Sequence, residues 1–273
     1  MGQSRKVRTV SASRPTMEGA GVRLRRAFGF GDTEATDPFL LLDDFRGDDP
    51  GDYIAGFPWH PHRGIETITY MLEGTVEHGD SMGNKGTIGP GDTQWMTAGS
   101  GIIHQEMPQP GPRGRMGGFQ LWANLPKSHK MMDPRYRGLK ASGIPEVVQK
   151  NGTRIKVICG NVDGQVGAVR DIVIDPEYLD VTVPAKSEFT HPTRRGHTVF
   201  AYVIDGKGYF CKEKKPFSYD MEGSSYFDMQ RDPFLVNGDL VLFHDGDQVM
   251  VTTEDDPVRF LLISGKPIGE PVA

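Results

Sequence analysis

The chain has 273 residues, of which 37% are hydrophobic and 25% charged, and its net charge is −5. This composition is typical of a globular protein, and the length allows two domains of about 100–150 residues each. No apolar run reaches the roughly 18–20 residues that a membrane helix needs, and the basic start is not followed by the apolar stretch of a secretory signal. We therefore expect no membrane contact and a cytoplasmic protein, or a nuclear one if the source is eukaryotic.

Charge and cysteine content exclude further classes. The stretch Asp32–Asp52 carries eight carboxylates and one arginine, a balance that would repel a phosphate backbone. We expect no direct nucleic-acid binding, and we interpret the basic cluster Arg23–Arg26, which contains the apolar Leu24, as the solvent-facing side of a strand. The only two cysteines, Cys159 and Cys211, exclude a disulfide framework and a thiolate metal cluster.

Glycine and proline, 35 and 20 residues, divide the chain into short segments rich in Val, Ile, Thr, Tyr and Phe. This pattern predicts many short strands joined by turns. The clearest predicted strands are, in chain order, Thr67–Met71, Lys156–Cys159, Asp171–Ile174, Val199–Ile204, Leu240–Phe243 and Arg259–Ile263. Two short helices are predicted, one directly after Pro134 and one within Asp220–Met229.

A coarse internal repeat predicts two similar domains. Residues 60–74 and 191–208 both begin with His-Pro, place Arg-Gly before a β-rich run, and contain an acidic residue followed by glycine at the end of that run. Each stretch is followed by a Gly-Asp pair ahead of another apolar strand. We therefore predict an all-β chain of two tandem barrels, residues 1–135 and 136–273, joined within the polar stretch 125–152.

Two pairs of polar residues carry the chemistry that the sequence suggests. His60 and His62 are two residues apart in an extended segment, so both side chains lie on one face of the predicted strand. His104 and Glu106 show the same spacing. If both strands face one interior, three imidazoles and one carboxylate surround a single point, and this donor set suits Fe(II), Mn, Co, Ni, Cu or Zn. An octahedral metal there would keep two neighbouring positions open.

A single His-x-His pair is more often a surface or hydrogen-bonded feature than a set of ligands. The second pair favours the metal interpretation, because Gly-x-x-His-x-Glu follows about forty residues later, after glycine-rich turns. Glu66 would lie on the face of the first pair, either as a ligand or, as we prefer, as a partner that orients an imidazole. His78 falls in a turn-rich connection and is predicted to be exposed to solvent.

The second half of the repeat lacks these ligands. When the two halves are matched on their acidic-Gly closures, Pro192 and Arg194 replace the His-x-His pair. When they are matched on their Gly-Asp pairs, Val251 and Thr253 replace the His-x-Glu pair. We therefore expect the second domain to hold no metal, and we assign His191 a structural or surface role.

Apolar and aromatic residues surround the predicted metal site. Most of them are expected to form the barrel core, and a few would wall a cavity that suits a flat aromatic ligand. The set comprises Phe57, Trp59, Tyr70, Trp95, Met96, Met107, Phe119, Leu121 and Trp122.

Four segments of the first half together resemble the pirin family of the cupin superfamily. They are DPFLLLDDF (37–45), FPWHPHRGIETIT (57–69), GPGDTQWMTAGSGIIHQEM (89–107) and FQLWANLP (119–126). The resemblance implies a bicupin, a chain of two jelly-roll barrels, whose second barrel lacks metal. It also implies that one iron is held by the four residues that match the ligands of the family, His60, His62, His104 and Glu106.

The resemblance also implies function. Some pirins are similar to quercetin dioxygenases, which open the central ring of a flavonol with dioxygen, while animal members act as nuclear cofactors of transcription. The first role predicts a dioxygenase of small aromatic substrates in which Glu106 takes the proton of the flavonol 3-hydroxyl as general base. The alternative is a metal-binding regulator that acts through protein contacts, and a third hypothesis is that the metal only braces the barrel. We expect a monomer with one divalent metal, Fe(II) before Mn, Co, Ni, Cu or Zn.

Overall fold

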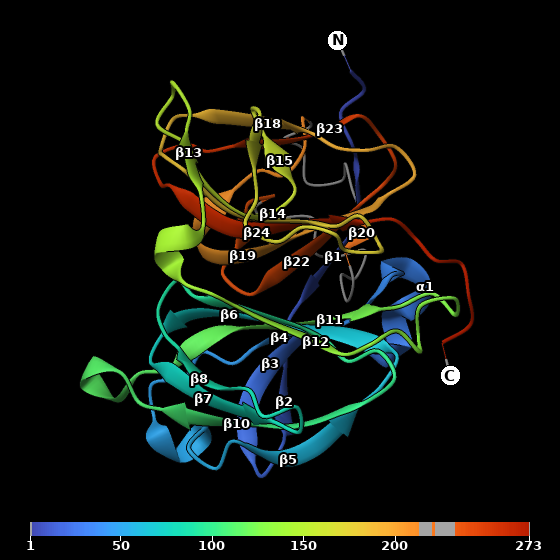
Figure 1. Cartoon of the computed structure of the whole chain (residues 1–273). Coiled ribbons are helices and arrows are strands. Elements are labelled where there is room, and N and C mark those ends of the chain that lie inside the picture. Colours follow the sequence, from blue (N-terminus) through green and yellow to red (C-terminus); the bar gives the residue numbers. More distant parts are fainter. Residues whose placement is uncertain (1, 213–219, 222–232, 273) are drawn as a thin grey trace. The chain divides into compact units, whose positions relative to one another are not determined.

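The computed structural model describes residues 2–212, 220–221 and 233–272. They form two compact units, each shown as a stack of strands in Figure 1. The unit that we call the N-terminal barrel contains Arg14–Ile144 together with Ile268–Ala273. The unit that we call the C-terminal barrel contains Met1–Ser13 together with Pro145–Pro267. The predicted all-β chain of two barrels is therefore confirmed.

The N-terminal barrel consists of two facing sheets, with strand orders β5-β10-β7-β8 and β12-β9-β6-β11-β4-β3-β2. Its strands are β2 (Arg14–Glu18), β3 (Val22–Phe28), β4 (Phe39–Asp44), β5 (Phe57–His62), β6 (Ile65–Glu73), β7 (Thr75–Asp80), β8 (Lys85–Ile88), β9 (Thr93–Thr97), β10 (Ile102–Gln109), β11 (Gly117–Asn124) and β12 (Arg135–Leu139). The helical turns are η1 (Phe30–Asp32), α1 (Thr33–Thr36), η2 (Pro50–Asp52), η3 (Pro112–Gly114) and η4 (Ala141–Gly143). Among the described residues, no helix has the length and apolar character needed to cross a membrane.

The C-terminal barrel is built on a nine-stranded sheet in which β13-β14-β17-β24-β19-β22-β1-β20 are neighbours and β21 pairs with β19. The pairs β15-β16 and β18-β23 form two small sheets. The strands are β1 (Val7–Ala12), β13 (Glu146–Val148), β14 (Arg154–Cys159), β15 (Asn161–Val162), β16 (Gln165–Val166), β17 (Glu177–Val183), β18 (Glu188–Pro192), β19 (Thr198–Gly208), β20 (Asp220–Met221), β21 (Leu235–Val236), β22 (Asp239–Phe243), β23 (Gln248–Thr252) and β24 (Val258–Gly265).

The interiors of the two barrels differ in polarity. The C-terminal barrel encloses a continuous apolar core in which side chains such as Phe189, Val251 and Phe260 are fully buried. Among the described residues, the N-terminal barrel buries more polar side chains than the C-terminal barrel, and Gln94 and His104 are two of them. Because an unpaired polar group costs free energy when it is buried, its retention inside a barrel points to a functional site rather than to a packing role.

Five of the six predicted strands are confirmed, and the sixth, Asp171–Ile174, is wrong. That segment is irregular and ends in a turn, with Asp171 at φ 59° and the amide of Asp175 donating to the carbonyl of Ile172 at 3.1 Å. Its Ile-Val-Ile run has the composition of a strand, but aspartate on either side tolerates the left-handed backbone that a turn requires.

The predicted helix after Pro134 is also wrong. Residues 135–139 form β12, which pairs with β9 from Arg135 opposite Thr97 to Leu139 opposite Thr93. Pairing with an available sheet edge outweighs a weak local helix preference. Of the second predicted helix, within Asp220–Met229, the first two residues form β20, and the remainder lies outside the described residues.

The compact units differ from the domain bounds expected from the sequence. Strand β12 belongs to the seven-stranded sheet of the N-terminal barrel, so the division falls between residues 144 and 145, within the predicted joint but after position 135. Each end of the chain also belongs to the unit built mainly from the other half. Strand β1 pairs with β22, and Asp37 accepts hydrogen bonds from the amides of Ile268 and Gly269 at 2.8 and 2.7 Å. Such long-range pairing leaves no local signal.

Candidate metal centre

Two antiparallel strands position the predicted ligands. Strand β5 lies at the edge of the four-stranded sheet, where proline is tolerated because its missing N–H is not needed by a neighbour. Across β5 and β10, His104 is opposite His60 and Ile102 is opposite His62. The register then shifts because β5 carries an extra residue between Phe57 and His60, whereas β10 stays in regular register with β7 through Glu106.

The structure brings the three histidines together. One ring nitrogen of each of His60, His62 and His104 lies within 4.8 Å of the others, and the ring centroids are 4.4 to 4.9 Å apart. His104 is fully buried, and neither of its ring nitrogens has a hydrogen-bond partner among the described residues. A buried imidazole without a partner is costly, and a metal ion would satisfy it. The three residues therefore fit a transition metal.

The electrostatics of the site keep the imidazole lone pairs available. Burial, together with the neighbouring imidazoles, lowers the pKa of His62 and of His104 to about 3. His60 lies with Nδ1 2.8 Å from the carbonyl of Pro58, which as acceptor fixes the proton on Nδ1 and leaves Nε2 to act as a ligand. Neutral imidazoles are the form that binds metal.

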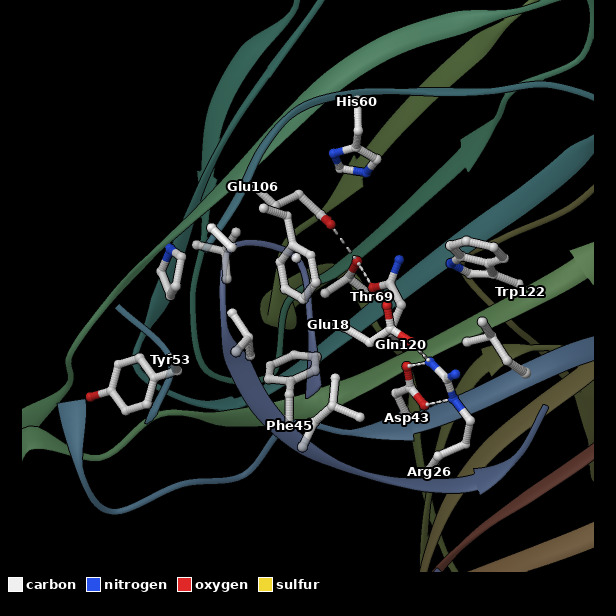
Figure 2. Close-up of a pocket in the computed structure, with 18 of the residues that line it drawn as sticks. Glu18, Arg26, Asp43, Phe45, Tyr53, His60, Thr69, Glu106, Gln120 and Trp122 are labelled. Atoms are coloured by element: carbon white, nitrogen blue, oxygen red, sulfur yellow. Dashed lines mark hydrogen bonds and ion pairs between the residues drawn. The ribbon is translucent and has the colours of Figure 1, made fainter. Parts of the chain in front are cut away.

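Glu106 lies beside this group but is not one of its three members. Its Oε1 is 3.1 Å from the hydroxyl of Thr69 and 3.3 Å from the amide nitrogen of Gln94. The same Thr69 hydroxyl lies 2.6 Å from Oε1 of Gln120. Oε1 of Glu106 and Oε1 of Gln120 would both be acceptors, but a hydroxyl has only one proton to donate. Turning the Gln120 amide resolves this, because Gln120 then donates to Thr69 and Thr69 donates to Glu106. Figure 2 shows this row from Glu106 through Thr69 to Gln120.

Glu66 has no bond to an imidazole in the structure. It is buried in β6 and accepts a hydrogen bond from the Thr97 hydroxyl at 2.6 Å, and burial raises the pKa of its carboxyl group. The role in orienting a histidine that we preferred for it stays a prediction without a contact to support it.

The prediction that His78 is exposed is wrong. His78 is buried in β7, stacks on Tyr136 at 4.6 Å between ring centroids, and lies 5.4 Å from the ring of His104. Its Nε2 is 3.4 Å from Asp80, which is opposite His104 across β7 and β10. The sequence contained a signal for this arrangement, since His78 and Asp80 repeat the two-residue spacing of the other pairs. His78 therefore packs against His104, one of the three clustered histidines.

A cavity of about 490 Å³ opens beside His60, His62 and Glu106. Its walls are mostly apolar, and of the predicted wall residues Phe57 and Trp122 line it, whereas Trp59 is 55% exposed. Trp122 meets the ring of His62 edge-on at 4.9 Å. Cavities of this size and polarity suit small organic ligands.

The geometry defines a class of protein, an all-β chain of two barrels, one of which carries a three-histidine site suited to a transition metal at the end of an apolar cavity. Comparison with models of known protein families identifies the family within this class. The model named Pirin matches residues 21–123, and the model named Pirin C-terminal cupin domain matches residues 178–273. The chain belongs to the pirin family, and its two barrels are cupin domains, as the four sequence segments indicated.

Individual relatives agree with this assignment. The chain is similar to a pirin-like protein of Caulobacter vibrioides, at 41% identity over 98% of this chain and 90% of that protein. It is 38% identical, over 100% of this chain and 90% of the other, to a Pseudomonas aeruginosa protein that carries the provisional name quercetin 2,3-dioxygenase. Among solved structures, a quercetin 2,3-dioxygenase from Acinetobacter baumannii matches with a TM-score of 0.82 at 27% identity, over 99% of this chain and 90% of that one.

Proposed function

We propose that this protein is a metal-dependent dioxygenase that opens the central ring of flavonols such as quercetin. The observation that carries the proposal is a buried three-histidine group placed beside the carboxylate of Glu106 at one end of an apolar cavity. The names of the Pseudomonas and Acinetobacter relatives support it.

In this proposal His60, His62 and His104 hold one divalent transition metal, with Glu106 as fourth ligand and Fe(II) as the first metal to test. A bound metal of this kind supplies Lewis acidity to a phenolic oxygen and the redox chemistry that reaction with dioxygen requires. The substrate is a small aromatic molecule, and it reacts in the N-terminal barrel alone.

Glu106 is the proton acceptor of the reaction. Its Oε1 is held by Thr69 and Gln94, while Oε2 has no partner among the described residues and belongs to a side chain that lines the cavity. Oε2, the oxygen through which Glu106 would also approach the metal, is the one that takes the proton of the flavonol 3-hydroxyl as general base. The apolar wall around Trp122 orients the flat ring system and excludes water from the flavonolate that results.

The test is oxygen uptake by the purified protein loaded in turn with Fe(II), Mn, Co, Ni or Cu. Quercetin should be consumed together with dioxygen, with bleaching of its visible band. Glu106→Gln should lower turnover by roughly 100-fold or more, the usual contribution of a positioned base, while the fold is kept. Glu77→Gln, which removes the same charge from an exposed position of β7, is the matched control.

Three other outcomes would contradict the proposal. An absence of turnover with every metal, combined with metal-dependent binding to a protein partner, would support a regulator instead. Loss of both metal and melting temperature in Glu106→Gln would mean that the site braces the barrel. A Glu106→Gln variant with unchanged turnover would exclude Glu106 as the base.

A further inference from the structure

The cavity of the N-terminal barrel has a charged end that the proton transfer proposed above does not use. Arg26 of β3 donates from Nε and Nη2 to the two carboxylate oxygens of Asp43, at 2.8 and 2.7 Å. Its Nη2 also lies 2.8 Å from Oε1 of Glu18. Figure 2 shows this cluster with Gln120 and Thr69 between it and Glu106, so it lies away from the reacting end.

The three side chains of the cluster have different tasks. Asp43 is buried and is opposite Arg26 across β3 and β4, so their double hydrogen bond joins two strands of the wall. Glu18 is 40% exposed at the end of β2 and uses one oxygen on Arg26. The turn that follows Glu18 is fixed independently, because the amide of Ala20 donates to the carbonyl of Gly56 at 3.0 Å. Glu18 is therefore not required to hold this part of the fold.

The net charge of Glu18, Arg26 and Asp43, together with their unpaired atoms, determines which ligand groups this end of the cavity accepts. Two carboxylates and one guanidinium give a net charge of −1 when all are ionised, which disfavours a ligand carboxylate through like-charge repulsion. Glu18 Oε2 has no partner among the described residues, and Nη1 of Arg26 likewise has none. One open acceptor and one open donor within the same ion-paired cluster match neighbouring hydroxyl groups, each of which can both donate and accept.

We propose that the Glu18–Arg26 end of the cavity binds phenolic hydroxyl groups on the ring of the substrate that is remote from the three histidines. This end selects neutral, polyhydroxylated flavonols over unsubstituted or carboxylate-bearing ones, with Glu18 as the residue that determines the preference. The inference rests on the proposed function, because it names the substrate class of the same cavity.

The test compares three ligands that share one ring system. They are 3-hydroxyflavone, 3,3′,4′-trihydroxyflavone and 3-hydroxyflavone-4′-carboxylate, each titrated into metal-loaded protein without dioxygen, so that no turnover occurs. Binding is followed by calorimetry and by quenching of tryptophan fluorescence, since Trp122 lines the cavity. The trihydroxy ligand should bind about 10-fold or more tightly than 3-hydroxyflavone, as expected for hydrogen bonds to charged groups, and the carboxylate should bind more weakly.

The variant Glu18→Gln keeps the size of the side chain and removes its charge. It should reduce the preference for the trihydroxy ligand at least about three-fold and relieve the penalty on the carboxylate, whereas Glu77→Gln should preserve both ratios. The melting temperature of Glu18→Gln should remain that of the unaltered protein, and the variant Glu18→Asp, which restores the charge on a shorter side chain, should recover part of the preference.

Unchanged ratios in Glu18→Gln, or an unaltered protein that binds all three ligands equally, would overturn the inference. The two proposals can fail separately. If the protein prefers the trihydroxy ligand but consumes no oxygen, this inference holds and the proposed dioxygenase function is contradicted. If it turns over flavonols without any preference among the three ligands, the function holds and this inference is contradicted.

Discussion

The strand pairs β5–β10 and β18–β23 occupy corresponding places in chain order, one in each barrel. In β5–β10, His60 is opposite His104, while in β18–β23 Phe189 is opposite Val251. Both apolar residues are fully buried, and Phe189 packs edge-on against Phe260 at 6.0 Å between ring centroids. One barrel thus fills with side chains the space that the other leaves open for a ligand. A single pair of strands can serve either purpose, depending on which residues face inward.

The remaining histidine of β18 illustrates the same difference. His191 is buried, but its Nε2 lies 2.8 Å from the carboxylate of Glu177, so the ring already has a partner. In the N-terminal barrel, neither nitrogen of His104 has one among the described residues. Burial alone does not distinguish a ligand from a structural histidine. The hydrogen bonds of the ring distinguish the two here, because His191 has a partner and His104 has none among the described residues.

The largest effect is expected from creating a cavity in the apolar core of the C-terminal barrel. Phe189→Ala should lower the free energy of unfolding of the C-terminal barrel by about 3–5 kcal/mol, because it removes buried contacts and leaves a cavity. Hydrogen exchange of the amides of β18 and β23 measures this barrel separately. Phe189→Leu, which keeps most of the volume, should cost less than about 1.5 kcal/mol. A loss below about 1 kcal/mol in the alanine variant would mean that this interior is not closely packed.

The second largest effect is expected on metal binding, where His104 and His191 should differ. His104→Ala should weaken metal binding by more than roughly 100-fold, since loss of a partner that only orients a ligand already costs 10–100-fold. His191→Ala should leave the metal content unchanged although it removes an equally buried imidazole. Elemental analysis and competition with a chelator measure both. Equal metal loss in the two variants would show that the effect arises from general destabilisation.

Much of the candidate site could be predicted because its proposed ligands follow a local rule. The two-residue spacing of His60 with His62, and of His104 with Glu106, places each pair on one face of a strand whatever the rest of the fold. The role of Thr69 and Gln120 could not be predicted. Thr69 reaches Glu106 from β6 and Gln120 reaches Thr69 from β11, both in the other sheet, and nothing in a single sequence states which strands face each other.

The fold shows the same limit. The repeated acidic-Gly and Gly-Asp pairs were detectable because turns are local, and Gly74 and Gly206 indeed share a positive φ, of 70° and 72°. The exchange of chain ends between the barrels, and the strand β12 in place of a helix, depend on partners far away in the sequence. His78 was missed for a different reason. Its spacing with Asp80 was visible, but turn residues around it favoured an exposed loop.

The smallest expected effect concerns a feature that the two barrels share. Asp92 accepts a hydrogen bond from the amide of Gly89 at 2.9 Å, and Asp239 accepts one from the amide of Val236 at the same distance. Asp92 also accepts bonds from the amide of Ala141 and from Nζ of Lys140, both at 2.8 Å. Burial raises the pKa of Asp92, but these bonds outweigh it and hold the pKa below its ordinary value of 3.8.

A carboxyl group whose pKa is lower in the folded state stabilises the fold at neutral pH, and this contribution disappears as the pH falls below 3.8 through the folded-state pKa. Asp92→Asn should therefore lose about 1 kcal/mol at pH 7, and its difference from the unaltered protein should shrink towards pH 3. Urea unfolding across this range measures it, with exposed Glu34→Gln as control. A difference independent of pH would mean that the Asp92 bonds stabilise the turn through geometry rather than charge.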